Sequence, residues 1–278
     1  MPLDFSQAYF QGELEKKVRN FEKIRKTTVL LFNADMEPPA VDWICNMVRK
    51  RKIKGGVDFF IESAGGDLDS AYHIGKLLQE SVKGKLTFIV PRYAKSAATL
   101  LCCAGDEIIM TRKAELGPLD PQIRLKGERF SALAVKAALG LINQNYTDKK
   151  TSLANKLATL LPSPLMLGEL DRSLEISKSY LNKLLMGRMF RNGNNKKKVN
   201  DISEKLAKKY THHLYVINHE EAKNELKLKV RLPSLKENDY IYEIHNLQAK
   251  INEIRVIQKK LSEHALMKRI INKMDVNL

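Results

Sequence analysis

The chain of 278 residues is 44% apolar and 29% charged, which excludes a disordered or fibrous protein and is enough sequence for a sizeable core. Its 48 Lys and Arg against 32 Asp and Glu give a net charge of +16, which favours acidic partners such as nucleic acid, an anionic membrane surface or an acidic polypeptide. No apolar run is long enough to span a membrane and the N-terminal segment is charged throughout, so we expect a cytoplasmic protein that at most a partner holds peripherally on a membrane.

Predicted helices and strands alternate over the first part of the chain. Apolar side chains near helical spacing predict a lead-in helix over residues 5–25, and short apolar or β-branched runs predict the strands. Short connections between such elements are typical of parallel strands joined by right-handed crossovers, so we expect an α/β layered core over about 27–125. The predicted strands are 27–33, 56–63, 85–90 and 106–110, and the helices between them are 38–52, 67–82 and 97–104.

Beyond about residue 130 the pattern becomes mostly helical. A polar, basic loop at 191–198 is followed by another helix and by a short strand–helix–strand segment that ends near residue 232. From residue 239 onward, mixed charges and helical spacing predict one or two amphipathic helices, which either lie on the body or contact a partner or a second copy of the chain. The other predicted helices of this half are 130–146, 151–161, 169–190 and 199–210.

This pattern predicts three parts. A lead-in helix occupies residues 1–26, the main domain occupies 27–232 with a helical insertion at about 130–200, and a helical tail occupies 233–278. The cysteines are Cys45 and the adjacent pair Cys102–Cys103, which cannot easily bond to each other, and no spacing typical of metal ligands appears. We expect three buried thiols in a reducing compartment, with no metal or organic cofactor.

Two of the strand-to-helix loops carry the smallest side chains of the core. The first contains Gly65-Gly66, which is compatible with a simple turn, a phosphate cradle or an oxyanion hole made of backbone N–H groups. The full glycine patterns of dinucleotide and P-loop sites are absent. The second contains Ser96, which is placed either to cap the next helix or to expose a nucleophile. Consecutive β-α loops open on the same sheet edge, so the two loops can face each other.

The strings "ESAGGDLDSAYHIGKLL" and "VPRYAKSAATLLCCAGDEIIMTRKAELGPLDPQI" resemble the ClpP/crotonase superfamily, and within it the serine dehydrogenase proteinase family. Its relatives include signal peptide peptidase A and archaeal membrane-linked Ser-Lys peptidases. The resemblance is dense over about 28–125 and returns weakly at "HHLYVINHEEAKNELKLKV". It implies a ClpP/crotonase-like spiral core with a largely helical C-terminal half, Ser96 as nucleophile, and an oxyanion hole formed by Gly65, Gly66 and the Ala97 N–H.

The general base is where the sequence departs from that family. ClpP-type enzymes place a histidine soon after the serine, but the matching stretch "LGPLDPQ" offers Asp120, and none of the six histidines lies between His73 and His212. Ser-Lys relatives use a lysine further on, a place that Lys136 fits. His213 falls close to the position of the acidic triad member in ClpP. We therefore take Lys136 and His213 as candidate bases, with Lys95, Lys149 and Lys150 behind them and Asp120 as an orienting carboxylate or a turn residue.

The sequence-based prediction is an ATP-independent serine peptidase of Ser-Lys or similar type, which acts on an extended polypeptide and assembles into a homo-oligomer, as the resemblance implies. A catalytically degenerate relative that serves as an oligomeric scaffold or binding protein is the main alternative. The charge of +16 also suggests an anionic membrane surface, a membrane-protein partner or sequence-blind nucleic-acid binding, although no recognisable nucleic-acid module supports the last. Acyl-CoA chemistry on the crotonase branch is disfavoured by Ser96 and "LGPLDPQ".

Overall fold

The computed structural model divides the chain into two compact units, each described here by itself. The first unit consists of residues 1–29 and 233–278, and the second of residues 30–232. The described residues are 3–51, 53, 55–120, 122–125, 128–147, 155, 164–210 and 212–275.

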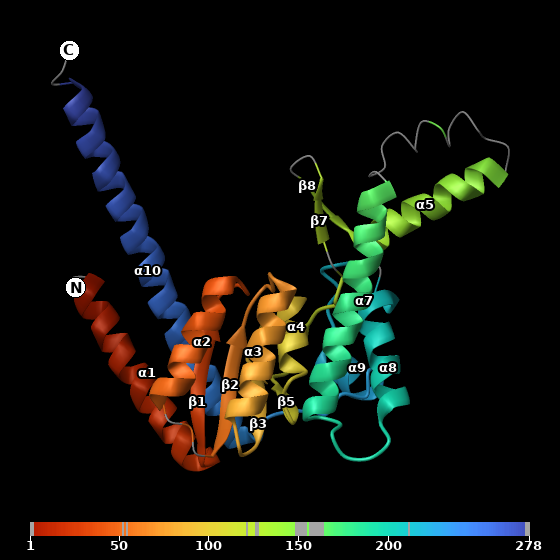
Figure 1. The fold of residues 1–278 in the computed structure, drawn as a ribbon. Coiled ribbons are helices and arrows are strands. Elements are labelled where there is room, and N and C mark those ends of the chain that lie inside the picture. Colours follow the sequence, from red (N-terminus) through yellow and green to blue (C-terminus); the bar gives the residue numbers. More distant parts are fainter. Residues whose placement is uncertain are drawn as a thin grey trace. The chain divides into compact units, whose positions relative to one another are not determined.

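The first unit pairs the two ends of the chain (Figure 1). Helix α1 (Leu3–Arg25) packs along helix α10 (Leu235–Asp275), and the buried ring of Phe21 lies 6.1 Å from the ring of Tyr240. A partly buried ion pair between Arg25 Nη1 and Glu237 Oε1, 2.8 Å apart, joins the same two helices. The lead-in and the tail are therefore partners within one unit, and the tail is one continuous helix over its described length.

A five-stranded sheet forms the centre of the second unit, with strand order β1-β2-β3-β5-β9. The pairs β2–β3, β3–β5 and β5–β9 are parallel, and Phe88 pairs with Phe59 on one side and with Ile108 on the other. The predicted α/β core with a parallel sheet is confirmed. The strands are β1 (Thr27–Asn33), β2 (Gly56–Glu62), β3 (Leu86–Val90), β5 (Glu107–Met110) and β9 (Val230–Arg231).

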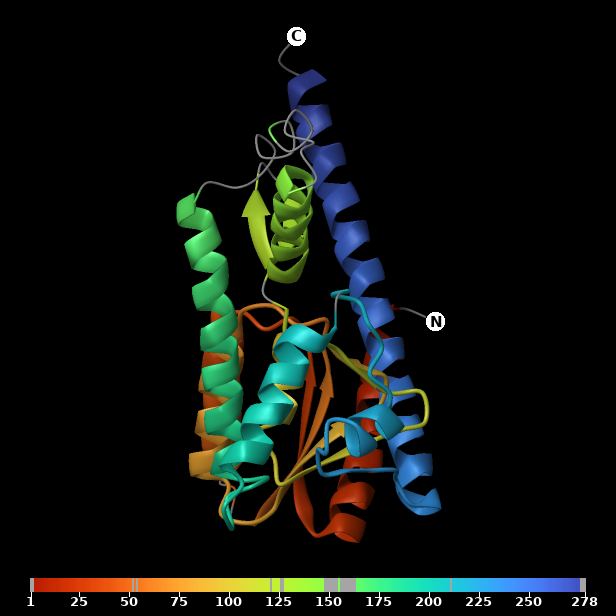
Figure 2. The same cartoon turned by 90° about the vertical axis from the view of Figure 1, so that its right-hand side faces the viewer.

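Helices enclose this sheet and make up most of the C-terminal half, as predicted. Helix α3 packs against α2, α4 and α7, and α7 lies beside α8 (Figure 2). Gly75 allows the approach of α3 to α7, because an added Cβ would lie 3.0 Å from a methyl group of Leu184. The helices are α2 (Pro38–Arg51), α3 (Leu68–Ser81), α4 (Ala97–Cys102), α5 (Ala132–Thr147), α7 (Pro164–Gly187), α8 (Lys196–Glu204) and α9 (His219–Asn224), with a π-helical turn η1 (Lys205–Lys209) after α8.

Short strands connect the core to the helices that follow. Strands β4 (Tyr93–Ala94) and β6 (Glu115–Leu116) pair in parallel, and β7 (Gln122–Leu125) and β8 (Glu128–Ser131) form an antiparallel hairpin. The hairpin was not predicted, because each strand has only four residues and "ERFS" shows neither an apolar run nor a regular alternation of polar and apolar residues. The predicted helix at 151–161 lies almost entirely outside the described residues.

The cysteines follow the sequence-based prediction in two cases out of three. Cys102 and Cys103 are buried in α4 and directly after it, and burial raises the pKa of the Cys103 thiol to about 12. The expectation that Cys45 is buried was wrong, because Cys45, on α2, is exposed. None of the helices in the described part of the chain has both the length and the apolar character that a membrane crossing needs.

Candidate active site

The Gly65-Gly66 turn has no room for a Cβ atom at either position. Both residues have positive φ, +109° and +129°, a region that residues other than glycine rarely adopt. A Cβ on Gly66 would lie 2.3 Å from the carbonyl oxygen of Met36, and a Cβ on Gly65 would lie 3.0 Å from Ser96 Cβ and 3.4 Å from Ala97 N. The glycines therefore let the loop after β1 and the loop after β3 approach the same turn.

Hydrogen bonds within this turn distinguish the two glycines. The Met36 N–H donates to Gly65 O (2.7 Å), and the Asp67 N–H donates to Met36 O (2.6 Å). The Gly65 N–H donates to Ser63 Oγ at 3.2 Å, so it is already used inside the turn. Gly66 lines a cavity, and its N–H makes no hydrogen bond to any residue that the structure describes. Of the two glycine N–H groups that the sequence suggested for an oxyanion hole, the one of Gly66 therefore remains available. Gly65 lacks a side chain that would collide with the Ser96 loop.

Ser96 has an unusual backbone conformation at the start of α4. Its φ of 49° and ψ of −118° lie outside the regions that L-residues normally occupy, a strain of about 1–3 kcal/mol. Although Ser96 occupies the N-cap position, its side chain makes no capping hydrogen bond. The capping role considered from the sequence is therefore not what holds Ser96 in place, and its hydroxyl lines the same cavity as Gly66.

The loop that carries Asp120 is fixed to the Ser96 loop by Thr99. The Thr99 hydroxyl donates to Ala94 O (2.7 Å) and accepts from the Gly117 N–H (3.0 Å) in the buried interior. Further along the loop, the Leu119 N–H donates to Leu206 O of η1 (2.9 Å). These bonds hold the segment "LGPLD" against α4 and bring the buried Asp120 to the cavity, where its side chain is 1% exposed.

The loop that carries His213 is attached to the same segment. Leu116 and Ile217 exchange two backbone hydrogen bonds, at 2.9 and 3.1 Å, in an antiparallel bridge. Lys95 Nζ reinforces this link, because it donates to Leu116 O and Tyr215 O, each at 3.3 Å, and lies 3.3 Å from a carboxylate oxygen of Glu115. Lys95 therefore ties the two loops together instead of lying in the cavity with Ser96.

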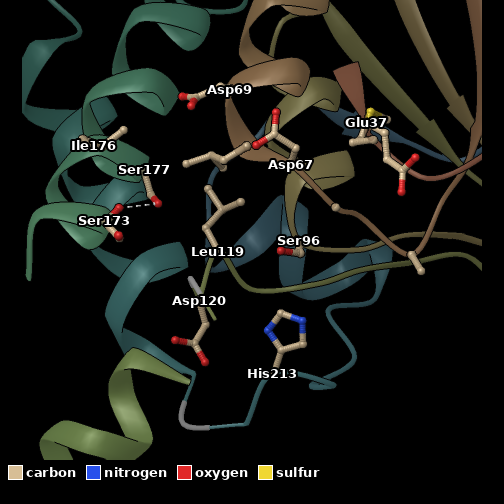
Figure 3. Close-up of a pocket in the computed structure, with 14 residues that line it drawn as sticks. Glu37, Asp67, Asp69, Ser96, Leu119, Asp120, Ser173, Ile176, Ser177 and His213 are labelled. Atoms are coloured by element: carbon tan, nitrogen blue, oxygen red, sulfur yellow. Dashed lines mark hydrogen bonds between the residues drawn. The ribbon is translucent and has the colours of Figure 1, made fainter. Parts of the chain in front are cut away.

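These loops and helix α7 surround a cavity of about 670 Å³ (Figure 3). The Ser96 hydroxyl lies in its middle, and the Asp120 carboxylate and the half-buried His213 imidazole lie at one end. No three carboxylate, imidazole or thiol groups of the described residues are arranged to hold a metal ion. The lining residues are Met36, Glu37, Ala64, Gly66, Asp67, Leu68, Asp69, Ser96, Leu119, Asp120, Ser173, Ile176, Ser177 and His213.

Lys136 occupies a different place. It lies on α5, its side chain is 46% exposed, and its Nζ is 2.6 Å from Asp171 Oδ1 on α7. It is absent from the lining of the cavity, whereas His213 and Ser96 both line it. Lys149 and Lys150, the other candidates on this side, lie outside the described residues.

Several lining residues were not predicted from the sequence. Asp67 and Asp69 lie at the start of α3, where Asp67 accepts a capping bond from the Ser70 N–H at 2.8 Å. Both also line the cavity, together with Glu37, which comes from the loop before α2. Ile176 on α7 forms another part of the wall. No local pattern indicates these positions, because they reach the cavity only through the tertiary fold.

Comparison with known families gives one match to a family model. Residues 41–158 match the family described as ClpP-like SDH-type serine proteinase, a segment that contains both loops and is less than half of the chain. Two uncharacterised proteins of Methanocaldococcus jannaschii are similar over shorter segments: one is 43% identical over 67 residues and the other 38% identical over 93 residues. These segments are 24% and 34% of this chain, but only 23% and 30% of the relatives' own length.

Solved structures are similar at low sequence identity. Two mutants of a membrane-bound stomatin-specific protease, one of them in complex with a substrate peptide, align with TM-scores of 0.48 at 14% and 15% identity. They cover 75% of this chain and 80% and 76% of theirs. The ClpP catalytic domain from Plasmodium falciparum aligns with a TM-score of 0.45 at 12% identity, over 80% of this chain and 91% of that domain.

Proposed function

We propose that the chain is a serine peptidase that hydrolyses peptide bonds through an acyl-enzyme on Ser96 and requires no ATP, because residues 41–158 match the ClpP-like SDH-type serine proteinase family. The observation that carries this proposal is the conformation of Ser96. A strained serine whose hydroxyl does not cap its own helix, and which lines a cavity beside a glycine turn, is the arrangement that exposes a nucleophile.

His213 is the base of the proposed reaction, because it lines the cavity with Ser96. As Ser96 Oγ attacks the scissile carbonyl, the imidazole takes the hydroxyl proton and then gives it to the leaving amine. The Asp120 carboxylate at the same end of the cavity orients the imidazole and stabilises its protonated form. Water then attacks the acyl-enzyme, again with His213 as base, and releases Ser96.

The N–H groups of Gly66 and Ala97 form the oxyanion hole of this proposal. Gly66 lines the cavity, and Ala97 N lies next to the glycine turn at the start of α4. Such donors stabilise the negative charge that develops on the carbonyl oxygen in the transition state. The Ser96 hydroxyl makes no capping hydrogen bond, and the hydrogen bonds of a catalytic serine often form only when the substrate is bound.

The Ser-Lys alternative places the base at Lys136 and needs a rearrangement of α5, because the Lys136 ammonium is paired with Asp171 outside the cavity. The substrate of either version is a polypeptide in extended form. A cytoplasmic location, assembly into a homo-oligomer, and contact with an anionic membrane surface or a membrane protein are further parts of the proposal.

The direct test is incubation of the purified protein with an unfolded polypeptide in the absence of ATP. We expect fragments with new amino termini, detected by mass spectrometry, and inhibition by a serine-directed fluorophosphonate. Failure to cleave unfolded polypeptides of varied sequence, by a protein whose circular dichroism shows it to be folded, would favour the scaffold role.

A further inference from the structure

The charge of the cavity is opposite to that of the chain. Among the lining residues that the structure describes, four are carboxylates and none is Lys or Arg, although the chain carries 48 of these basic residues and a net charge of +16. Asp120 lies with His213 at one end, where the proposed proton transfer takes place. The other three carboxylates, Glu37, Asp67 and Asp69, have no part in that proton transfer.

Neutral groups hold two of these three carboxylates. Asp67 accepts from the backbone N–H and the hydroxyl of Ser70, and Asp69 accepts from the Tyr180 hydroxyl at 2.8 Å. In the part of the chain that the structure describes, neither aspartate forms an ion pair, and neither does Glu37. The start of α3 supplies a partial positive charge of about half a unit, which is less than the two negative charges of Asp67 and Asp69.

The pKa of Tyr180 shows the effect of these negative charges. Its pKa is raised, first by its hydrogen bond to Asp69, then by burial, and further by the charges of Asp69 and Asp67. A phenolate is disfavoured beside these carboxylates, and a cation is favoured there for the same reason. The cavity thus offers an electrostatic environment that suits a positively charged group.

The remaining walls suit the stem of a long side chain. Leu68, Leu119 and Ile176 line the same cavity, and Figure 3 shows Asp67 and Asp69 on the side of Ser96 opposite to Asp120 and His213. Lysine and arginine combine an aliphatic stem with a charged end, so one such side chain could contact both the apolar wall and the carboxylates. Glutamate would be repelled, and an uncharged aliphatic residue would leave the carboxylates without a cation.

We propose that this cavity selects polypeptide substrates that carry lysine or arginine next to the scissile bond, with Asp67 and Asp69 as the residues that recognise the cation. The proposal rests on the proposed peptidase function and adds the substrate class to it. It also explains why Asp69 and Glu37 are acidic, since neither of them caps helix α3.

The test starts from the cleavage sites in unfolded polypeptides and continues with a matched set of quenched fluorescent peptides. The peptides differ at one position, beside the mapped scissile bond, which holds Lys, Arg, norleucine or Glu. Norleucine keeps an aliphatic stem without the charge. We expect kcat/KM for Lys and Arg to exceed that for norleucine at least tenfold and that for Glu by more, with a smaller ratio at high salt. Equal values for Lys, norleucine and Glu would overturn the selectivity but not the peptidase, whereas a complete lack of cleavage would overturn both.

A charge-removing variant tests the recognising residue. Asp69→Asn keeps the size of the side chain and an acceptor for the Tyr180 hydroxyl but removes the charge. We expect it to lower the Lys-to-norleucine ratio at least threefold, and this ratio does not depend on how much of the variant is folded. The control is Glu80→Gln, an exposed carboxylate on the same helix that pairs with Lys76 and should leave the ratio unchanged. An unchanged ratio in Asp69→Asn would exclude Asp69 as a recognising residue.

Discussion

Ser96→Ala is expected to lower kcat/KM for polypeptide cleavage at least ~10⁴-fold, because it removes the attacking oxygen while leaving the cavity in place. The fold should tolerate the change. Since the Ser96 side chain makes no capping hydrogen bond, its removal does not incur the usual loss of about 0.5–2 kcal/mol for a helix cap. The midpoint of urea unfolding should therefore stay close to that of the wild-type protein.

The control for this experiment is Ser262→Ala. Ser262 is an exposed serine on α10 whose hydroxyl donates to the backbone carbonyl of Gln258 in the same helix, so its loss should change neither activity nor stability measurably. Contamination by another protease is excluded when the specific activity stays constant over successive column fractions. If Ser96→Ala then cleaves at the wild-type rate, Ser96 is not the nucleophile.

His213→Ala is expected to lower kcat/KM about 10²–10⁴-fold, the range that general-base catalysis by a positioned side chain supplies. Lys136→Ala should stay within about twofold of wild type, because its ammonium is held by Asp171 away from the cavity. The comparison of these two variants in one assay distinguishes the two candidate bases.

His212→Ala is the matched control for His213. The two histidines are adjacent, but His212 is exposed and its Nδ1 accepts from the backbone N–H of Leu214. Loss of activity in Lys136→Ala together with full activity in His213→Ala would reverse the assignment and favour a Ser-Lys enzyme. It would also mean that α5 moves its lysine to Ser96 when substrate binds.

Much of the fold could be predicted because the core strands are short and almost purely apolar. All five residues of β3, "LTFIV", are buried, and a run of that length and composition between turn residues is typical of a central parallel strand. The hairpin of β7 and β8 lacks such a run. The pairing of α1 with α10 has no local pattern either, because it depends on contacts between the two ends of the chain.

In the candidate site, too, the residues that could be predicted are those with a local sequence pattern. Gly66 and Ser96 could be identified because a close approach of backbones and a sharp turn both demand particular residue types at fixed places in the sequence. His213 could be proposed only through the family resemblance. It reaches the cavity through hydrogen bonds between Leu116 and Ile217, and through the amine of Lys95, which no sequence pattern indicates.

The role of Lys136 shows how separation along the chain can mislead. Its distance from Ser96 in sequence fits a Ser-Lys enzyme, but sequence separation does not determine where a helix lies. Leu170 and Leu174 of α7 pack with Ala132 and Val135 of α5, and with these contacts in place Lys136 faces Asp171. The alternative through His213 depends on two loops that are fixed to the sheet edge by buried hydrogen bonds.

The measurement that tests the central claim most directly is the mapping of a fluorophosphonate adduct by mass spectrometry. We expect a single modified residue, Ser96, with labelling that is lost in Ser96→Ala, strongly slowed in His213→Ala and retained in Lys136→Ala. Labelling at another serine, or a folded protein that reacts no faster than the Ser96→Ala variant, would contradict the assignment of Ser96 as the nucleophile.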